Sequence, residues 1–330
     1  MATPSPTSVR LPSDELREHL MVQVAKLYYD LEKTQSEIAT EVGLTRWQVS
    51  RLIREARELG IVRIEIVPRS QRRPDLETAL QKRFGLVEAI VVPGGYADDD
   101  GMSLDGVAQA AGQYLAGINP PVSLIGVSWG RTMAAVAHWL PPAWNDGVHV
   151  VLVNGATNVR STSQQTNVVA ERFARAGNGV ATLLPVPAIV GKESTREALE
   201  QDPVIAAVLD LAEQAPVVCF SIGALSHHSV LVESGYLDTA DIDALGRIGA
   251  IGDILGHFID ADGAIAAPEL DSRTLGLRPE SLRGKERAVC VSAGRAKHAV
   301  LRAVLKAGYA NVLVIDAASA EYLIGSEHGR

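Results

Sequence analysis

The chain has 330 residues, of which 47% are hydrophobic, and a formal net charge of −8 at pH 7. This length predicts about two domains on a prior of roughly 100 to 200 residues each. The negative charge excludes a protein that coats nucleic acid over its whole surface, and no uninterrupted apolar run reaches the roughly 18 residues of a membrane span.

The charge is divided unevenly along the chain. Residues 1–74 carry 12 basic and 10 acidic side chains, whereas the remaining residues carry 19 and 29. A slightly basic head on an acidic body fits a DNA-binding module joined to a part that does not contact DNA. The two cysteines, Cys219 and Cys290, lie in apolar runs without metal-ligand spacing. We therefore expect core residues of a reduced, cytoplasmic protein, with no metal site and no cofactor.

The N-terminal residues predict a tail followed by a helix. Residues 1–13 are rich in Pro, Ser and Thr and lack an apolar stretch, which indicates a disordered tail and not a signal peptide. Residues 14–31 then predict a helix whose apolar stripe consists of Leu16, Leu20, Val24, Leu27 and Leu31.

The segment 33–67, KTQSEIATEVGLTRWQVSRLIREARELGIVRIEIV, predicts a helix-turn-helix. Thr34 with Glu37, and Thr45 with Gln48, are each spaced as a capping box, so each threonine begins a helix. Gly43 between them ends the first helix, because glycine adopts a left-handed cap at little cost. Residues 61–67 alternate as a strand and predict a wing.

The second helix of this segment has one apolar and one polar face. Val49, Leu52, Ile53 and Ala56 recur at helical spacing and face the core. Arginine and glutamine opposite them can each pair with a purine edge. An ordinary amphipathic hairpin with solvated arginines is the alternative, but the coincident capping boxes, turn glycine and arginine-rich face favour DNA binding. The predicted DNA-binding residues are Thr34, Gln35, Thr45, Arg46, Trp47, Gln48, Ser50, Arg51 and Arg54.

Residues 14–68 thus predict a winged helix-turn-helix domain, residues 69–75 a linker and residues 76–330 a larger domain. In the larger domain short β-branched runs alternate with helical patterns, which predicts a doubly wound α/β fold with a mostly parallel sheet. The predicted strands are 89–92, 122–127, 148–154, 181–184, 217–222, 288–292 and 312–315, and the predicted helices include 107–116, 132–139, 168–176, 204–212 and 297–307.

Three strand-to-helix loops are candidates for a binding site, because ligands of such folds lie at the carboxyl ends of the strands. They are GVSWGRT (126–132), VNGAT (153–157), which opens a polar loop reaching residue 166, and SAGRAKH (292–298). Helix N-termini bind phosphate, and Arg131, Arg295 and Lys297 add positive charge there.

Two of the motifs allow other interpretations. G-x-S-x-G at Ser128 is also the nucleophile elbow of α/β-hydrolases, and a triad can be drawn with Asp253 or Asp262 and with His257 or His298. The glycines can equally permit a tight turn in which Ser128 caps a helix. Asp253, between glycines in GDILG, suits vicinal hydroxyls of a sugar or polyol, or is a turn residue that bonds its own backbone.

Together, TQSEIATEVGLTRWQVSRLIREARELGIVRI, GVSWGRT, VNGAT, SIGAL, GDILGHFIDADG and SAGRAKHAVLRAVLKAG resemble the SorC family of sugar-responsive bacterial transcriptional regulators. The likeness runs from about residue 20 to residue 324 in family order. It implies an effector domain similar to sugar-phosphate isomerases and deaminases, which binds a sugar, polyol or sugar phosphate and assembles into tetramers or dimers. An enzyme acting on sugar phosphates or a serine hydrolase is the alternative, whereas the resemblance implies no catalytic residues.

The resemblance also implies roles for individual residues. Asp253 contacts sugar hydroxyls and Lys297 the phosphate, in a pocket formed by Ser128, Gly130, Arg131, Thr132, Asn154, Gly155, Gly223, Gly294 and Arg295. Arg295 stands where the family often has a second glycine. Some members trap an aldehyde with a lysine near the VNGAT loop, and no lysine of this chain lies there, so covalent capture is not expected. The implied partners are double-stranded operator DNA and the small molecule, and no membrane.

Overall fold

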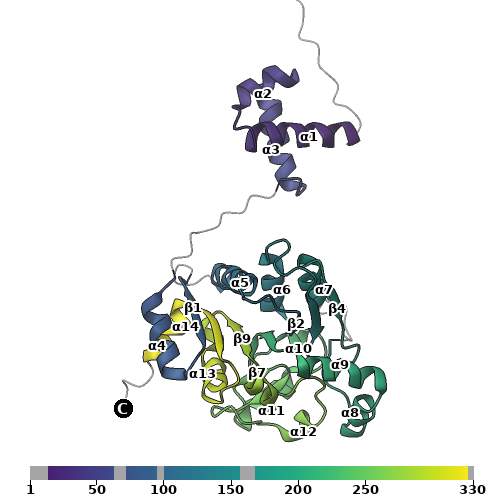
Figure 1. Cartoon of the computed structure of the whole chain (residues 1–330), viewed down its shortest axis with the longest axis vertical. Coiled ribbons are helices and arrows are strands. Elements are labelled where there is room, and N and C mark those ends of the chain that lie inside the picture. The colour runs from purple at the N-terminus through teal and green to yellow at the C-terminus, as the bar shows by residue number, and fades with distance from the viewer. Residues whose placement is uncertain (1–13, 63–71, 95–99, 157–167, 326–330) are drawn as a thin grey trace, which may run out of the picture. The chain divides into compact units, whose positions relative to one another are not determined.

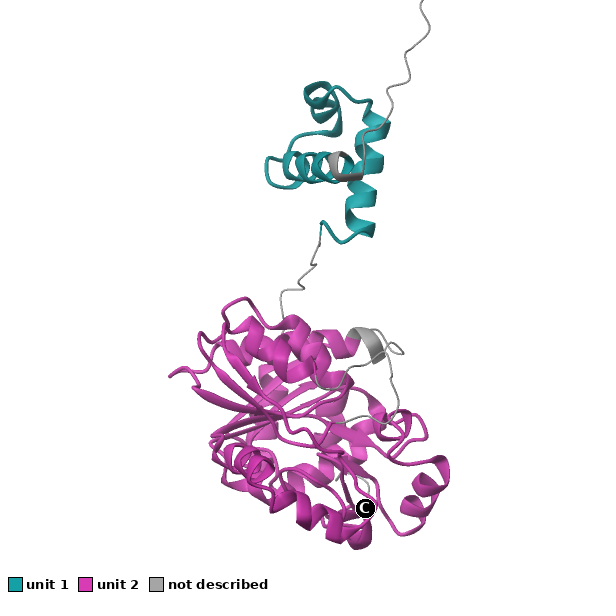
Figure 2. Cartoon of the chain, turned by 90° about the vertical axis from the view of Figure 1, so that its right-hand side faces the viewer, with its two compact units in different colours: residues 1–69 teal, residues 70–330 magenta. Residues whose placement is uncertain are grey.

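The computed structural model describes residues 14–62, 72–94, 100–156 and 168–325, and the chain separates into two compact units, Met1–Arg69 and Ser70–Arg330 (Figure 2). Within these ranges, no helix combines the length and apolar character that crossing a membrane requires. The predicted tail, most of the predicted wing, the first residues of the predicted linker and the polar loop from 157 to 166 lie outside the described residues.

In its described residues, 14–62, unit 1 has three helices, α1 (Asp14–Tyr29), α2 (Gln35–Val42) and α3 (Arg46–Glu58). Both predicted capping boxes are present. Thr34 accepts a hydrogen bond from the backbone of Glu37, whose carboxylate accepts from Thr34 in return, and Thr45 and Gln48 do the same at the start of α3. Gly43 ends α2 in the left-handed conformation, with φ of 69°. The two helices therefore begin and end where their sequence signals lie.

A small apolar core holds the three helices of unit 1 together. Val24 and Leu27 of α1 pack with Ile38 of α2 and with all four predicted core residues of α3, which are Val49, Leu52, Ile53 and Ala56. The predicted stripe of α1 is wrong at its last position. The helix stops at Tyr29, and Leu31 lies beyond it with 61% of its surface exposed.

Unit 2 begins with α4 (Pro74–Phe84), whose first residues were predicted to belong to the linker. Proline suits the first turn of a helix, because its missing N–H has no helical partner there. Asp75 and Glu77 add favourable negative charge to the same turn. Pro74 and Asp75 are therefore helical and do not form part of a linker.

The centre of unit 2 is a seven-stranded sheet in which every neighbouring pair is parallel. Its order is β1-β10-β9-β5-β2-β3-β4, as Figure 1 shows in part. All seven strands coincide with predicted ones, within a few residues at their ends: β1 (Glu88–Val92), β2 (Leu124–Val127), β3 (His149–Leu152), β4 (Val180–Thr182), β5 (Val217–Phe220), β9 (Arg287–Ser292) and β10 (Val312–Asp316).

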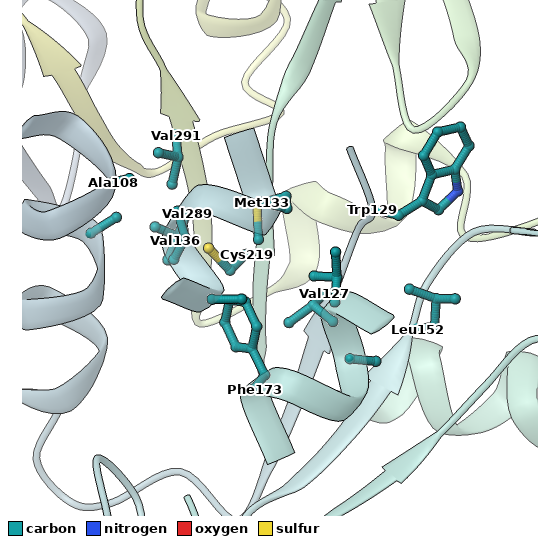
Figure 3. Packing of buried hydrophobic residues seen from close by; sticks show 14 of the residues in the cluster. Ala108, Val127, Trp129, Met133, Val136, Leu152, Phe173, Cys219, Val289 and Val291 are labelled. Atoms are coloured by element: carbon teal, nitrogen blue, oxygen red, sulfur yellow. The ribbon is translucent and has the colours of Figure 1, made fainter. Parts of the chain in front are cut away.

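Two apolar cores lie on the two faces of this sheet, because alternate residues of each strand point to opposite faces. One core joins the strands to α5, α6 and α7, and Figure 3 shows Met133, Val136 and Phe173 of these helices beside Val127 and Val289. The other joins them to α4, α9, α13 and α14. The bounds are α5 (Asp100–Ala116), α6 (Arg131–Trp139), α7 (Val168–Ala176), α9 (Pro203–Gln214), α13 (His298–Lys306) and α14 (Ala317–Gly325).

A second sheet was not predicted. It is antiparallel, with β7 (Gly252–Ile254) between β6 (Ile222–Ala224) and β8 (His257–Ile259), and it pairs Gly223 with Asp253. Short helical elements complete the unit: α8 (Glu193–Glu200), α10 (Val230–Glu233), α11 (Thr239–Arg247), α12 (Pro268–Asp271) and the 3₁₀ turns η1 (Pro279–Gly284) and η2 (Arg295–Lys297). The small sheet brings Asp253 close to the carboxyl ends of the large one.

Candidate functional site

A cavity of about 320 Å³ opens at the carboxyl ends of β2, β5 and β9. This is the edge at which α/β sheets bind ligands, and the volume lies at the small end of ligand pockets. The residues after each strand line it, joined by the small sheet. Nine of the eleven predicted effector residues are present: Ser128, Gly130, Arg131, Thr132, Asn154, Gly223, Asp253, Gly294 and Lys297.

Lys297 contributes an ammonium group to the lining of this cavity. Its Nζ donates to the hydroxyl of Thr132 at 3.0 Å and to the hydroxyl of Ser221 at 3.3 Å. Burial lowers the pKa of Lys297 to about 8, although the nearby carboxyl of Asp253 favours the charged form. Neither hydroxyl neutralises the ammonium group, so an anionic group of a ligand would gain a strong interaction with it.

Asp253 lies in the middle strand of the small sheet. Burial raises the pKa of its carboxyl group, against the opposing effects of the Gly256 N–H, which Oδ2 accepts at 3.1 Å, and of Lys297 and His257. A carboxylate held by one backbone donor keeps lone pairs for further donors. Hydroxyl groups of a bound ligand can supply them.

Asn154 supplies a second acceptor. Its side chain is buried, with 4% of the residue exposed, and its Oδ1 has no hydrogen-bond partner among the described residues. An unpaired buried acceptor costs free energy, and a ligand hydroxyl that donates to it removes this cost. Asp253 and Asn154 thus provide acceptors and Lys297 a donor within one cavity, which is the combination that a polyhydroxylated ligand needs.

The start of α6 forms another side of the cavity. Gly130 precedes the helix and provides no side-chain cap, so backbone N–H groups of the first turn stay available for a ligand. Arg131 follows directly, but its guanidinium donates to the backbone oxygen of His228 at 2.8 Å and lies 3.5 Å from the carboxylate of Glu233. The guanidinium of Arg131 therefore already has partners in and just before α10.

Two predicted effector residues do not line the cavity. Gly155 packs against the backbone of Pro187, and its carbonyl accepts a hydrogen bond from Trp129 Nε1 at 2.8 Å. Arg295 is exposed. Conversely, Ser221 was missed, although it directly follows β5 and binds Lys297. The rule that ligands lie at the carboxyl ends of parallel strands could have found it.

The hydrolase interpretation of Ser128 finds no triad in the described residues. The Oγ of Ser128 accepts a weak hydrogen bond from the Ser221 N–H at 3.4 Å, and among the described residues no histidine is hydrogen-bonded to it. His257 instead pairs with Asp271 at 2.6 Å, His298 stacks on Tyr322, and Asp262 pairs with Lys306. A serine without a base at hydrogen-bond distance is not activated as a nucleophile.

The predicted DNA-binding residues of unit 1 form a second candidate surface. Thr34, Thr45, Arg46, Trp47, Ser50 and Arg54 are exposed, and Gln35, Gln48 and Arg51 are partly exposed. The Gln48 carboxamide oxygen accepts bonds from the backbone and hydroxyl of Thr45, both within 3 Å. The amide nitrogen of Gln48 is thus the part of this side chain left to contact DNA.

The larger unit belongs to a known class of domain. Residues 69–325 match the model of the sugar-binding domain family, Sugar-bind. The Deoxyribonucleoside regulator of Bacillus subtilis is 30% identical over 311 residues, which are 94% of this chain and 99% of that protein. The Erythritol catabolism regulatory protein EryD of Brucella abortus is 28% identical and covers 95% of this chain and 98% of its own length.

Solved structures agree with these relatives. The full-length Sorbitol Operon Regulator SorC of Klebsiella pneumoniae superposes with a TM-score of 0.69 at 26% identity, over 94% of this chain and 100% of that one. The chain belongs to the SorC family of sugar-binding transcriptional regulators.

Proposed function

We propose that this chain regulates genes of carbohydrate or polyol metabolism, that α2 and α3 form its operator-reading helix-turn-helix, and that the cavity of unit 2 binds the controlling sugar, polyol or sugar phosphate. The observation that carries the proposal is the convergence of Lys297, Asp253 and Asn154 on one small cavity in a chain of this family. The relatives named above act on different metabolic systems, so the effector class is proposed from the cavity and not from them.

The cavity suits a ligand of monosaccharide size. Asp253 and Asn154 accept hydrogen bonds from hydroxyl groups, and Lys297 with the free N–H groups at the start of α6 receives a phosphate. Charged partners make such hydrogen bonds roughly twice as strong as neutral ones. A phosphorylated polyol or sugar therefore makes stronger hydrogen bonds in this cavity than a neutral one does.

DNA binding is proposed for the polar face of α3. Arg46, Trp47, Ser50, Arg51 and Arg54 lie opposite the buried residues, and base edges of the major groove are read by such side chains. One module buries too little surface to be selective. We therefore propose that the chain acts in the cytoplasm as a homo-oligomer, a tetramer or a dimer, that reads paired half-sites.

Control by the effector requires a difference in affinity. A ligand shifts DNA binding only if it binds more tightly to one arrangement of the protein than to another. A coupling free energy of about 1 to 3 kcal/mol, or 5- to 150-fold in affinity, is typical. Since Ser128 has no base beside it among the described residues, we propose binding without turnover at this site.

Selection from random duplex DNA tests the DNA-binding part of this proposal. The full-length protein is expected to enrich a motif with two related half-sites, and its binding to that motif is expected to weaken steeply with salt. A thermal-shift panel of pentitols, hexitols, pentoses and their phosphates tests the other part. If the protein enriches no motif and converts a member of the panel into product, the proposed function is wrong and the protein is an enzyme acting on sugar phosphates.

A further inference from the structure

Arg51, near the middle of α3, is held between two neighbours on its own helix. Its guanidinium carbon lies 5.3 Å from the ring centroid of Trp47, one turn earlier. Its Nε lies 3.4 Å from a carboxylate oxygen of Glu55, one turn later. Residues four positions apart share one face of a helix, so the three side chains form a continuous row.

Glu55 is itself fixed from another helix. Arg17 of α1 donates to both of its carboxylate oxygens, at 2.9 and 2.8 Å. Both bonds come from one nitrogen, Nη2 of Arg17, which holds the carboxylate of Glu55 beside α1. A partly exposed ion pair adds little stability. The contact therefore acts on geometry, because it fixes Glu55 relative to α1, and Glu55 lies beside Arg51.

This arrangement determines which atoms of Arg51 face outward. Its Nε is buried, makes no hydrogen bond among the described residues and lies 3.4 Å from a carboxylate oxygen of Glu55. Its two terminal nitrogens thus remain for DNA. Two parallel N–H groups of an arginine match O6 and N7 of guanine in the major groove.

Trp47 presents an apolar surface beside that guanidinium. The residue is 67% exposed, on the first turn of α3, although it is among the largest apolar side chains. The apolar feature of the major groove is the 5-methyl group of thymine. A ring at this position can contact that methyl group while its face holds the arginine.

We propose that Trp47 and Arg51 form one reading unit for a thymine next to a guanine in each half-site, and that Glu55, oriented by Arg17, is the positioning residue for Arg51. The inference rests on the DNA-binding role proposed above. It adds Glu55 and Arg17, which lie outside the predicted DNA-binding residues. It also assigns the two bases that Trp47 and Arg51 contact.

The first arm of the test replaces each guanine of the selected half-site by adenine and measures binding of the full-length protein by fluorescence anisotropy. At one guanine, this replacement is expected to weaken binding of the wild type by about tenfold or more and to leave binding of Arg51→Ala unchanged. Glu55→Gln is expected to reduce that discrimination by roughly 3- to 10-fold, since a freed arginine must be ordered on binding. Glu58→Gln, an exposed neighbour, is the matched control.

The second arm removes a single methyl group from the DNA. Deoxyuridine in place of the neighbouring thymine is expected to weaken binding of the wild type by about 3- to 10-fold, because it differs from thymidine only in lacking the 5-methyl group. Trp47→Ala is expected to bind both DNAs equally. Arg17→Ala, which removes both hydrogen bonds to Glu55, is expected to reduce the guanine preference in the same direction as Glu55→Gln.

A merely structural role of Glu55 has a different signature. It would lower the melting temperature and weaken binding to all DNA alike, with the guanine preference unchanged, and this result would overturn the inference. Equal sensitivity of wild type and Trp47→Ala to deoxyuridine would overturn the thymine contact. If the wild type selects no motif, the proposed DNA binding itself fails, which is a distinguishable outcome.

Discussion

The Nζ of Lys297 lies 3.0 Å from the hydroxyl oxygen of Thr132, and this contact joins the loop after β9 to the first turn of α6, 165 positions apart in the chain. The same ammonium reaches Ser221 after β5. One partly buried cation thus connects the ends of three neighbouring strands. Its state of protonation bears directly on what the cavity binds.

Binding of a phosphorylated effector is expected to depend on pH through Lys297. The pKa of this group is about 8 in the free protein, and the phosphate itself, with a second pKa of about 6, stays dianionic above pH 7. The charged lysine is present below pH 8 and is lost above it. Affinity measured by calorimetry should therefore fall above pH 8, by up to about tenfold per pH unit.

Lys297→Arg is the control for this dependence, because arginine stays charged throughout the range. It should lack the fall between pH 8 and pH 9.5, whatever its affinity. A wild-type affinity that is constant up to pH 9.5, or an equal fall in Lys297→Arg, would show that Lys297 does not bind the phosphate.

Gly223→Ala is expected to disable the effector site without unfolding unit 2. A Cβ at this position would lie 2.0 Å from Oδ1 of Asp253, which is closer than atoms approach, so the carboxylate must move. Losing a hydrogen bond to a charged group costs about 1.5 to 3 kcal/mol, or roughly 10- to 150-fold in effector affinity by calorimetry. Gly191→Ala, with open space around its Cβ, serves as control. An effector affinity within twofold of wild type would contradict the placement of Asp253.

Asn154→Ala is expected to weaken effector binding with little effect on the free protein. Its Oδ1 has no partner to lose among the described residues, and the variant no longer buries an unpaired acceptor. We expect the effector affinity to fall about 3- to 10-fold, the range of one neutral hydrogen bond. A large drop in melting temperature without a change in affinity would instead assign Asn154 a structural role.

Thr45→Ala is expected to destabilise the start of α3. The variant loses the cap that its hydroxyl provides to the Gln48 N–H, which is worth about 0.5 to 2 kcal/mol. Hydrogen exchange of the α3 amides should become faster by the corresponding factor in the full-length protein. Thr45→Ser retains a hydroxyl and should behave like the wild type. Equal exchange in both variants would mean that the cap contributes nothing.

The large sheet and unit 1 could be predicted because their signals are local. Runs such as VLVI at Val312 are apolar and mostly β-branched, as is typical of strands buried on both faces. The caps at Thr34 and Thr45 need only residues three positions apart. The sheet of β6, β7 and β8 could not be predicted in this way, because its strands are three residues long and contain Gly223 and Gly252. The reason for Gly223 appears only when Asp253 is seen across from it.

The candidate site could likewise be predicted only where local signals mark its residues. Glycine-containing turns after strands identified most of the cavity, since those turns share one edge of a parallel sheet. Ser221 was missed because it lies inside the predicted strand 217–222 and not in a glycine-containing turn, and its contact with Lys297 depends on β5 lying between β2 and β9. Glu55 likewise looks like a solvated residue of α3, and its contact with Arg17 joins positions 38 residues apart. Contacts of this kind follow from packing and not from spacing.

The central claim is that a ligand in the cavity of unit 2 controls DNA binding. Its most direct test is the anisotropy of labelled operator DNA with full-length wild type and Asp253→Asn, titrated with the panel member that stabilises the wild type. We predict a change in the wild-type DNA affinity of about 5- to 150-fold. Asp253→Asn should bind free operator equally well and require at least about tenfold more ligand. An operator affinity that no panel member changes, or an identical response of Asp253→Asn, would contradict the claim.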